Sequence, residues 1–280
     1  MLKTLALMKR PLSNAITIDP LTSEDVEYVG ALQPDGWGNI LTSIRFYCTA
    51  AFCHPLKATI DDKIVGIGTA ILHGSTAWLA HIIVHKDYRN AGIGTAITNS
   101  LIGLVRKTSC ETILLIATPL GEPVYKKLGF DVETQYIFFD NGSLPEPADN
   151  VNVVQFHERY RIALMEFDHR VSGEYRQELF TPFLAGSKIF LESNELKGFY
   201  LPTLGEGLII SSDPQAGTEL MKHRGRMNNL FCIPVDNKHG IHFLEQNGYQ
   251  KLREASRMIM GKKILWDASQ IYNRIGGNLG

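Results

Sequence analysis

The sequence lacks the patterns that mark metal-binding and disulfide-rich proteins. It contains only four cysteines, and these form neither a C-x-x-C pair nor a disulfide framework. They are Cys48, Cys53, Cys110 and Cys232. His239 and His242 lie three residues apart on a predicted helix, but no carboxylate or thiolate at a matching spacing completes a metal site. We therefore expect no bound metal ion.

An excess of one charge and a long apolar run are also absent. The chain has 28 Lys and Arg against 29 Asp and Glu, a net charge of −1, which creates no field favouring nucleic acid or a membrane surface. No apolar run approaches the length of a transmembrane helix. The segment Met1–Arg10 is too short and too charged for a secretory signal and lacks a cleavage site. We expect a cytoplasmic protein that binds neither nucleic acid nor membranes.

The composition is that of an ordinary globular protein. The 280 residues are 44% hydrophobic and 20% charged, and this length favours two domains over one. The segment Asn141–Asn150 is rich in Pro, Gly and polar residues, which is typical of a linker. We therefore predict an N-terminal domain over residues 1–142 and a C-terminal domain over residues 151–280.

The most informative stretch is the turn Tyr88–Gly94. Before it, Ala77–Val84 is apolar and rich in β-forming residues, which predicts a buried strand. After it, Ile93, Ile97 and Leu101 recur at helical spacing. Glycines let the backbone approach a ligand closely, and the first N–H groups of a helix have no intrahelical partner. The turn therefore predicts an anion site suited to a phosphate or pyrophosphate.

Two nucleotide-binding motifs do not fit this turn. A dinucleotide fingerprint requires a third glycine, but Ile97 stands at that position. A P-loop requires Gly-Lys-Ser/Thr, which is absent here. From these residues alone, a tight strand-to-helix turn without any ligand remains the alternative.

A longer pattern combines the turn with a second segment. Val84-x4-Arg89-x2-Gly92-x-Gly94 is followed by Tyr125–Phe130. In this order and at this separation, the two segments resemble motifs A and B of the GNAT family of acetyl-CoA-dependent N-acetyltransferases. The resemblance implies an α/β fold with a mixed central sheet flanked by helices. It also implies that the turn holds the pyrophosphate of coenzyme A, with acetyl-CoA as the cofactor.

The resemblance, which covers residues 15–140, assigns cofactor contacts to the strand end and the turn. Backbone groups at the strand edge would pair with the pantetheine arm as with an added strand. An amide N–H near Ile83 would polarise the thioester carbonyl. The residues implied in cofactor binding are Ile82, Ile83, Val84, Arg89, Asn90, Ala91, Gly92, Ile93, Gly94 and Thr95.

Two titratable residues are implied in catalysis. Tyr125 occupies the motif B position where many family members place a tyrosine facing the thioester sulfur, so we expect it to act as general acid. A tyrosine packed in the core is the alternative. Many members carry an acidic base around the position of Ala80, but here His81 is the only titratable group nearby. His81 could accept the amine proton directly or through a water, or it could only satisfy a hydrogen bond at the sheet edge.

The family pattern also implies an acceptor pocket walled by two helices. Helices are predicted over residues 22–33 and 40–52, the second with Leu41, Ile44 and Cys48 on one face. Trp37 lies between them and is a candidate substrate contact. A buried packing aromatic is the alternative for this residue.

The second half contains a further pattern, Asp-x-Arg-x-x-Gly-x-x-Arg, which begins at Asp168. It resembles the start of the C-terminal domain in tandem GNAT proteins, which implies Asp168 and Arg170 as acceptor-site residues. An ordinary capping and ion-pair cluster is the alternative. Helices are predicted on either side, near His157–Phe167 and Ser172–Leu184, and a terminal tail or short helix at Trp266–Ile275.

The rest of the second half repeats the first in outline. A predicted strand, turn and helix over residues 208–224 precede a strand and helix over residues 230–247, and Leu244–Tyr249 aligns with Tyr125–Phe130. The repeat has lost the Arg-x-x-Gly-x-Gly turn, and Leu244 replaces the tyrosine. We expect a degenerate GNAT-like domain that does not catalyse but shapes the acceptor pocket or mediates assembly.

Two functional hypotheses follow. In the first, the protein is an acyltransferase that moves an acetyl group from acetyl-CoA to a primary amine of a small molecule, by direct attack in a ternary complex. In the second, it is a catalytically inactive acyl-CoA-binding or protein-interaction module. The intact Arg89, Gly92, Gly94 and Tyr125 favour the enzyme, whereas the missing acidic base keeps the module open. The sequence leaves the acceptor and the oligomeric state undetermined, with a homodimer among the open assemblies.

Overall fold

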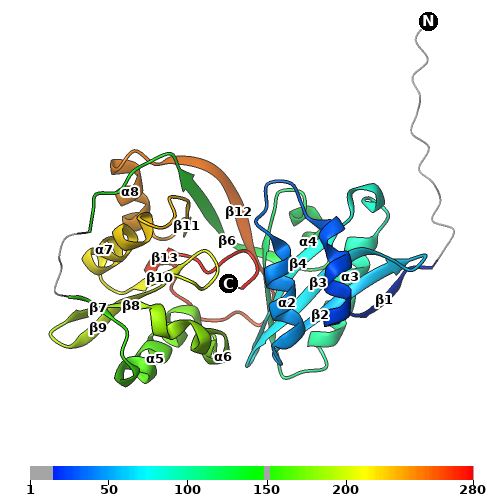
Figure 1. Ribbon diagram of the computed structural model, residues 1–280, viewed down its shortest axis with the longest axis horizontal. Coiled ribbons are helices and arrows are strands. Elements are labelled where there is room, and N and C mark those ends of the chain that lie inside the picture. Colours follow the sequence, from blue (N-terminus) through cyan, green and yellow to red (C-terminus); the bar gives the residue numbers. More distant parts are fainter. Residues whose placement is uncertain (1–14, 148–151, 280) are drawn as a thin grey trace, which may run out of the picture. The chain divides into compact units, whose positions relative to one another are not determined.

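The computed structural model describes residues 15–147 and 152–279. The predictions for Met1–Arg10 and for Ala148–Asn150 of the linker lie outside the described residues. The described chain is an α/β protein with an eight-stranded mixed sheet, a five-stranded sheet and flanking helices (Figure 1). This architecture confirms the expected fold class, including a second, partial domain.

Two compact units make up the chain. The first holds the described residues up to Thr69 together with His81–Leu101, and the second holds Ala70–Ala80 and the described residues from Ile102 onward. Two strands, β3 (Lys63–His73) and β4 (Thr76–Val84), and the helix α3 (Ile93–Val105) contribute residues to both units. The division into residues 1–142 and 151–280 stays a prediction, because it follows the sequence repeat and not the packing.

The first unit contains a hairpin and several helical segments. Its remaining elements are β1 (Thr17–Pro20), η1 (Ser23–Asp25), α1 (Val26–Val29), η2 (Gly30–Leu32), α2 (Ile40–Thr49), β2 (Cys53–Ile60), η3 (Lys86–Tyr88) and α3 (Ile93–Val105). Asp61 and Asp62, with φ of +49° and +59°, form the two-residue turn between β2 and β3. Asn39 caps α2, because its side chain accepts a hydrogen bond from Leu41 N at 3.0 Å. The Asn39 cap confirms the predicted start of the second helix.

Two glycines bring α3 close to β3. A Cβ at Gly66 would lie 2.9 Å from Cδ1 of Ile97, and a Cβ at Gly68 would lie 2.6 Å from its Cγ2. Side chains at either position would therefore push the helix away from the strand. Ile93, Ile97 and Leu101 are buried at this contact. The close packing fixes where α3 begins, and with it the turn that precedes the helix.

The second unit contains the remaining strands and helices. These are β5 (Thr112–Ala117), α4 (Glu122–Lys127), β6 (Asp131–Asp140), β7 (Val153–Gln155), η4 (Glu158–Tyr160), α5 (Arg161–Ser172), α6 (Gln177–Phe180), η5 (Thr181–Gly186), β8 (Lys188–Glu192), β9 (Glu195–Leu201), β10 (Leu208–Ser211), α7 (Pro214–Gly225), β11 (Phe231–Pro234), α8 (Lys238–Gln246), β12 (Gln250–Gly261), η6 (Ala268–Gln270) and β13 (Ile271–Asn273). Figure 1 shows α7 and α8 together beside β10, β11 and β13. Phe139, Leu220, Phe231 and Leu244 lie in the core that joins these elements.

The order of the strands in each sheet differs from their order in the sequence. The larger sheet runs β1-β2-β3-β4-β5-β12-β6-β11, and the smaller runs β13-β10-β9-β8-β7. Strand β12 pairs antiparallel with β5 on one side, where Ser256 lies opposite Ala117, and with β6 on the other, where Ser256 lies opposite Gln135. A strand from the C-terminal end of the sequence therefore lies between two strands that precede the linker.

Several expectations for the second half are wrong. A single helix, α5, spans Arg161–Ser172 where a break was expected, and it ends at Gly173, which has φ of +73°. The segment Trp266–Ile275 contains η6 and β13, so its chain continues as a strand. Strands β7, β8 and β9 were not anticipated; Ser193 and Asn194, with φ of +50° and +66°, form the tight turn between β8 and β9.

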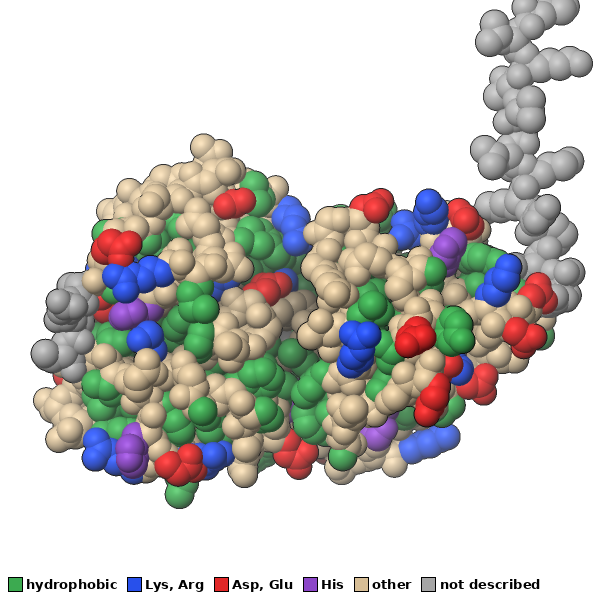
Figure 2. All heavy atoms as spheres, in the orientation of Figure 1, with side chains coloured by type: hydrophobic (Ala, Val, Ile, Leu, Met, Phe, Trp, Pro, Cys, Tyr) green, Lys and Arg blue, Asp and Glu red, His purple; other side chains and the backbone are tan. Residues whose placement is uncertain are grey.

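The described surface shows no dominant charge and no membrane-crossing element. None of the described helices is long and apolar enough to cross a bilayer. Among the residues that the structure covers, no three His, Cys, Asp or Glu side chains gather as a metal site would require. On the face shown in Figure 2, basic and acidic side chains are interspersed. The surface on this face therefore presents no broad patch of a single charge.

Candidate active site

The turn between β4 and α3 has a backbone shaped for close approach. Strand β4 ends at Val84, the short η3 follows, and α3 begins at Ile93. Asn90 and Gly92 both adopt left-handed backbone conformations, with φ of +62° and +81°. Successive turn residues in such conformations aim their N–H groups into a common concavity, which suits an anion. A side chain at Gly92 would be strained by its φ even though nothing lies within 4 Å of the Cβ position.

The start of α3 adds further donors. The N–H of Ala96 donates to the oxygen of Gly92 at 2.9 Å. The amides of Ile93, Gly94 and Thr95 come before this first helical bond. Gly94 itself has ordinary backbone geometry, and a Cβ there would meet only Cγ2 of Val84, at 3.6 Å. The chain's own packing therefore leaves room for a side chain at Gly94.

Arg89 is exposed but anchored at this turn. Its Nε donates to the oxygen of Val84 at 3.2 Å, which ties the guanidinium to the end of β4. Beside it, the Nδ1 of His85 accepts from the N–H of Asp87 at 3.3 Å and so caps η3. The positive charge of Arg89 and the helix amides together make an electrostatic cradle for an anionic group.

The end of β4 departs from regular strand geometry. The parallel ladder between β4 and β5 comprises Thr76–Trp78 opposite Thr112–Leu114. Three residues beyond this ladder, His81 has φ of +46°, which is rare for a residue with a side chain. A left-handed residue inside a strand changes the direction in which the following side chains and amides point. The backbone of Ile82, Ile83 and Val84 therefore follows a local distortion, at the segment where the sequence predicts cofactor contacts.

His81 lies among aromatic rings in the first unit. The hydroxyl of Tyr47 is 2.9 Å from its Nδ1, with ring centroids 5.5 Å apart, and Trp37 approaches edge-on at 6.0 Å. Burial lowers the pKa of His81 to about 4. The imidazole is therefore neutral at pH 7, with one ring nitrogen able to accept a proton.

Trp37 lies at the surface and not in the core. Its side chain is 47% exposed and borders a surface hollow of 520 Å³. The hollow is also lined by Gly30, Gln33, Pro34, Asp35, Gly36, Asn39 and Leu41. The structure therefore gives Trp37 the accessibility that a substrate contact needs, and its assignment as such stays a prediction.

Tyr47 is the site residue that the sequence analysis missed. The sequence predicts one face of the second helix with Leu41, Ile44 and Cys48. Of these, α2 buries Ile44, together with Ile40 and Tyr47. Their spacing of four and three residues carries the helical signal that could have identified this face.

Tyr125 lies on α4 of the second unit. Its ring packs edge-on against Phe130 at 6.0 Å, and burial raises its pKa to about 12. The hydroxyl therefore stays protonated at neutral pH and can donate a proton or a hydrogen bond. Helix α4 is held by an ion pair between Lys126 and Glu122 at 2.6 Å and by a hydrogen bond from Ser256 in β12 to Glu122. The catalytic role of Tyr125 stays a prediction.

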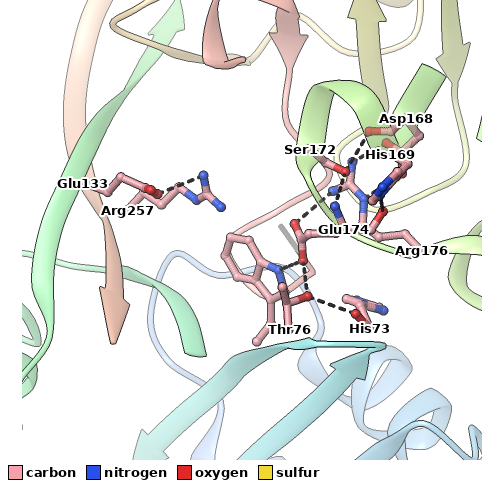
Figure 3. A network of polar contacts seen from close by, with 10 residues as sticks. His73, Thr76, Glu133, Asp168, His169, Ser172, Glu174, Arg176 and Arg257 are labelled. Carbon is pink, nitrogen blue, oxygen red and sulfur yellow. Dashed lines mark hydrogen bonds and ion pairs between the residues drawn. The ribbon is translucent and has the colours of Figure 1, made fainter. Parts of the chain in front are cut away.

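Asp168 lies in a buried ion-pair network (Figure 3). The Nε of Arg176 donates to its Oδ2 at 3.1 Å, and both side chains are buried. Arg170 lies over the ring of Phe167, with 4.8 Å between the guanidinium carbon and the ring centroid. The structure thus shows Asp168 in an ion pair, which was the alternative to acceptor binding. Acceptor binding by Asp168 and Arg170 stays a prediction.

Glu174 links this network to β4. Its Oε2 accepts from Nε1 of Trp78 at 2.7 Å and from the hydroxyl of Thr76 at 3.1 Å. Its Oε1 lies 4.0 Å from Nη1 of Arg176. Figure 3 shows Glu174 between Thr76 and Arg176. The network therefore joins the segment after α5 to the start of the strand that leads into the turn.

Comparison with known families identifies the same region. The profile of the Acetyltransferase (GNAT) domain matches residues 46–144, which include the turn and Tyr125. The uncharacterized N-acetyltransferase ycf52 of Pyropia yezoensis is 33% identical over 75 residues, which make up 26% of this chain and 43% of that protein. The chain thus spans less than half the length of this curated relative.

Two solved structures share the fold over most of the chain. A putative acetyltransferase from Pyrococcus horikoshii superposes with a TM-score of 0.79 at 21% identity, covering 95% of this chain and 96% of that one. A tandem GNAT protein from the clavulanic acid biosynthesis pathway superposes with a TM-score of 0.61 at 15% identity, covering 88% and 98%. At these identities the likeness shows a common fold.

Proposed function

We propose that this chain is an enzyme that acetylates amines, because the Acetyltransferase (GNAT) domain profile matches residues 46–144, which include the turn and Tyr125. The acetyl group comes from acetyl-CoA and moves to a primary amine of a small molecule by direct attack in a ternary complex. The observation that carries this proposal is the turn from Arg89 to Thr95, where Gly94 leaves space that the fold itself does not need. A ligand that approaches the backbone there accounts for the glycine.

In this proposal the turn holds the pyrophosphate of acetyl-CoA. The amides of Ile93, Gly94 and Thr95 donate to phosphate oxygens, and Arg89 supplies the positive charge. The left-handed geometry of Asn90 and Gly92 directs the preceding backbone toward the same concavity. The residues present fit an anionic cofactor because they combine backbone donors, a fixed cation and the absence of a blocking side chain.

Two proton transfers complete the reaction. The amine nitrogen forms a bond to the acetyl carbon as the bond from that carbon to sulfur breaks. His81 accepts the proton that the amine loses, since its imidazole is neutral at pH 7. Tyr125 donates its hydroxyl proton to the departing sulfur, since its phenol is protonated at that pH. Proton exchange with solvent then restores both residues.

The second half serves a structural role in this proposal. Leu244, which replaces the tyrosine in the repeat, is completely buried in the core of the second unit and offers no group for proton transfer. The alternative proposal is that the chain binds acyl-CoA without turnover, as a sensor or partner-binding module. It is supported by His81, which stands where an acidic base was expected.

Titration calorimetry on two matched variants tests the proposal. Gly94→Glu adds a carboxylate inside the cradle, and acidic residues are favourable in the first turn of a helix, so the fold should persist. At an effective dielectric constant of about 20, a like charge about 5 Å from a phosphate costs about 3 kcal/mol, or about 100-fold in affinity. Gly103→Glu changes the charge equally on the same helix, where nothing lies within 4 Å of the Cβ position.

The expected result is saturable binding of acetyl-CoA to the natural chain and to Gly103→Glu, with at least 100-fold weaker binding to Gly94→Glu. Release of free thiol in the presence of an amine library would then separate the enzyme from the inactive module. Equal affinity of both variants would refute the assignment of the turn. Binding without thiol release for any amine would favour the module.

A further inference from the structure

His81 is held in place from two directions. Its backbone is fixed in a left-handed conformation inside β4, and its Nδ1 lies 2.9 Å from the hydroxyl of Tyr47. Tyr47 is only 1% exposed, on the core face of α2, so its ring is itself anchored by packing. The imidazole therefore has a defined orientation before any ligand arrives.

This contact makes the two ring nitrogens unequal. Nδ1 is engaged by Tyr47, whereas Nε2 has no hydrogen-bond partner among the described residues and is not one of the buried unpaired nitrogens. Any proton transfer with a ligand must therefore use Nε2. A neutral imidazole carries one hydrogen, so Nε2 can accept a proton only when the hydrogen resides on Nδ1.

We propose that Tyr47 is the positioning residue for His81: its phenol oxygen accepts the hydrogen on Nδ1 and so presents the lone pair of Nε2 to the acceptor amine. This inference rests on the proposed acetyl transfer and deepens it. When Nε2 takes the amine proton, the bond from Nδ1 to Tyr47 becomes charge-assisted and stabilises the imidazolium. In this proposal Tyr47 acts on the amine proton through His81.

The surface hollow beside Trp37 indicates the class of acceptor. The ring centroids of Trp37 and His81 lie 6.0 Å apart, and Trp37 borders the hollow of 520 Å³. Asp35 also lines that hollow and supplies a carboxylate there. A carboxylate and an indole together suit an ammonium group. We infer that the acceptor of this site is a small amine that carries a second cationic group for the hollow.

Nitrogen NMR of the full chain tests the tautomer without any need for turnover. Protein labelled with ¹⁵N-histidine would be compared with His81→Gln, which identifies the signals of His81. The expected result is a hydrogen on Nδ1 and an unprotonated Nε2 at pH 7, with this preference lost in Tyr47→Phe. A hydrogen on Nε2 would overturn the proposal, because Tyr47 would then be the donor and His81 could not act as a base.

A double-mutant cycle tests the role in catalysis. Tyr47→Phe removes one oxygen and keeps the packing, so kcat should fall at least 10-fold while the KM for acetyl-CoA is unchanged. In the His81→Gln background, Tyr47→Phe should have no further effect on kcat. Tyr28→Phe, at a side chain that is 70% exposed, is the matched control. An equal loss of kcat in both backgrounds would overturn the positioning role.

The two experiments separate this inference from the proposed function. If the natural chain binds acetyl-CoA but acetylates no amine, the proposed function fails while the NMR result still decides the tautomer. An amine with a second cationic group should show a lower KM than a neutral amine of the same size, and Asp35→Asn should remove the difference. Equal KM values in the natural chain would refute the assigned acceptor class.

A separate observation concerns the second half, where strand β10, helix α7 and strand β11 repeat the order of β4, α3 and β5. Here β13 lies beside β10, with Ile209 opposite Asn273. It also reaches β11, because Arg274 N donates to Cys232 O at 3.1 Å and Cys232 N donates to the side chain of Asn273 at 2.9 Å. The chain itself therefore fills the space between these two strands.

Tyr272 of β13 also packs against the first turns of the two helices in this repeat. A Cβ at Gly217 of α7 would overlap the Tyr272 ring, and one at Gly240 of α8 would lie 3.2 Å from it. These glycines therefore make room for the protein's own tyrosine, in contrast to Gly94, whose surroundings are open. We infer that β13 takes the place of a cofactor in the second half, so that each chain binds a single acyl-CoA.

Native mass spectrometry of the full chain with coenzyme A tests this stoichiometry. The expected result is one bound molecule per chain and none in Gly94→Glu. Two molecules per chain, or one remaining in Gly94→Glu, would overturn the inference. No binding to the natural chain would refute the proposed function instead, while agreeing with a closed second half.

Discussion

Glu174 offers a quantitative test of how the second unit is held together. It is 2% exposed, and one carboxylate oxygen accepts from both Trp78 and Thr76, at 2.7 and 3.1 Å. Replacing Glu174 by alanine leaves the indole N–H of Trp78 buried without an acceptor, whereas the hydroxyl of Thr76 keeps the oxygen of His73 at 3.2 Å. An orphaned donor of this kind costs about 1–3 kcal/mol. Arg176 keeps its partner Asp168, so the expected loss in free energy of unfolding is about 2 kcal/mol.

Urea denaturation followed by circular dichroism would measure this loss. Glu158→Ala is the matched control, because that side chain is 64% exposed and its ion pair with Arg161 should contribute less than about 1 kcal/mol. Trp78→Phe removes the indole N–H, so a cycle with Glu174→Ala should give a coupling energy of about 1 kcal/mol or more. A loss below about 1 kcal/mol for Glu174→Ala would refute the claim that this carboxylate anchors β4 to the segment after α5.

Two further predictions concern titrating groups. Burial lowers the pKa values of His81 and His73 to about 4. The unfolded chain therefore binds more protons than the folded chain between about pH 6.5 and 4. The free energy of unfolding must fall as the pH drops through that window, by at most about 3 kcal/mol for each histidine. Denaturation midpoints measured across that range should show a shallower slope in His81→Gln, and an unchanged slope would contradict a buried neutral His81. Tyr125→Phe should lower kcat by about 100-fold and leave acetyl-CoA affinity unchanged in calorimetry, whereas full activity would remove Tyr125 from the mechanism.

Local sequence signals predicted the site-bearing part of the fold well. The turn Tyr88–Gly94 and the strand and helix on either side follow from residues close in sequence. Each of these features depends on backbone preferences or hydrophobic periodicity over a few residues. The resemblance to motif A and motif B rested on the same segments.

Features that depend on distant contacts could not be predicted in this way. The pairing of Tyr47 with His81 joins residues far apart in the sequence, and nothing near either residue indicates the other. The buried network around Glu174 also joins residues far apart in the sequence. Its charged residues, seen in the sequence alone, look like an ordinary capping and ion-pair cluster. Strand β13 was taken for a tail because three residues carry no periodicity, and only its contacts with β10 and Cys232 define it.

The place of β12 in the sheet has a consequence for how the chain is made. Strand β5 ends at Ala117, but its partner β12 begins only at Gln250. As the polypeptide leaves the ribosome, β5 and β6 emerge long before the strand that separates them, and their facing edges stay unpaired until β12 has been synthesised. Closure of this sheet therefore follows the synthesis of the whole segment between β5 and β12 and carries the loop-closure entropy of that segment. A nascent chain that stops before Gln250 exposes strand edges that can pair with other chains, so aggregation is the characteristic failure of incomplete synthesis.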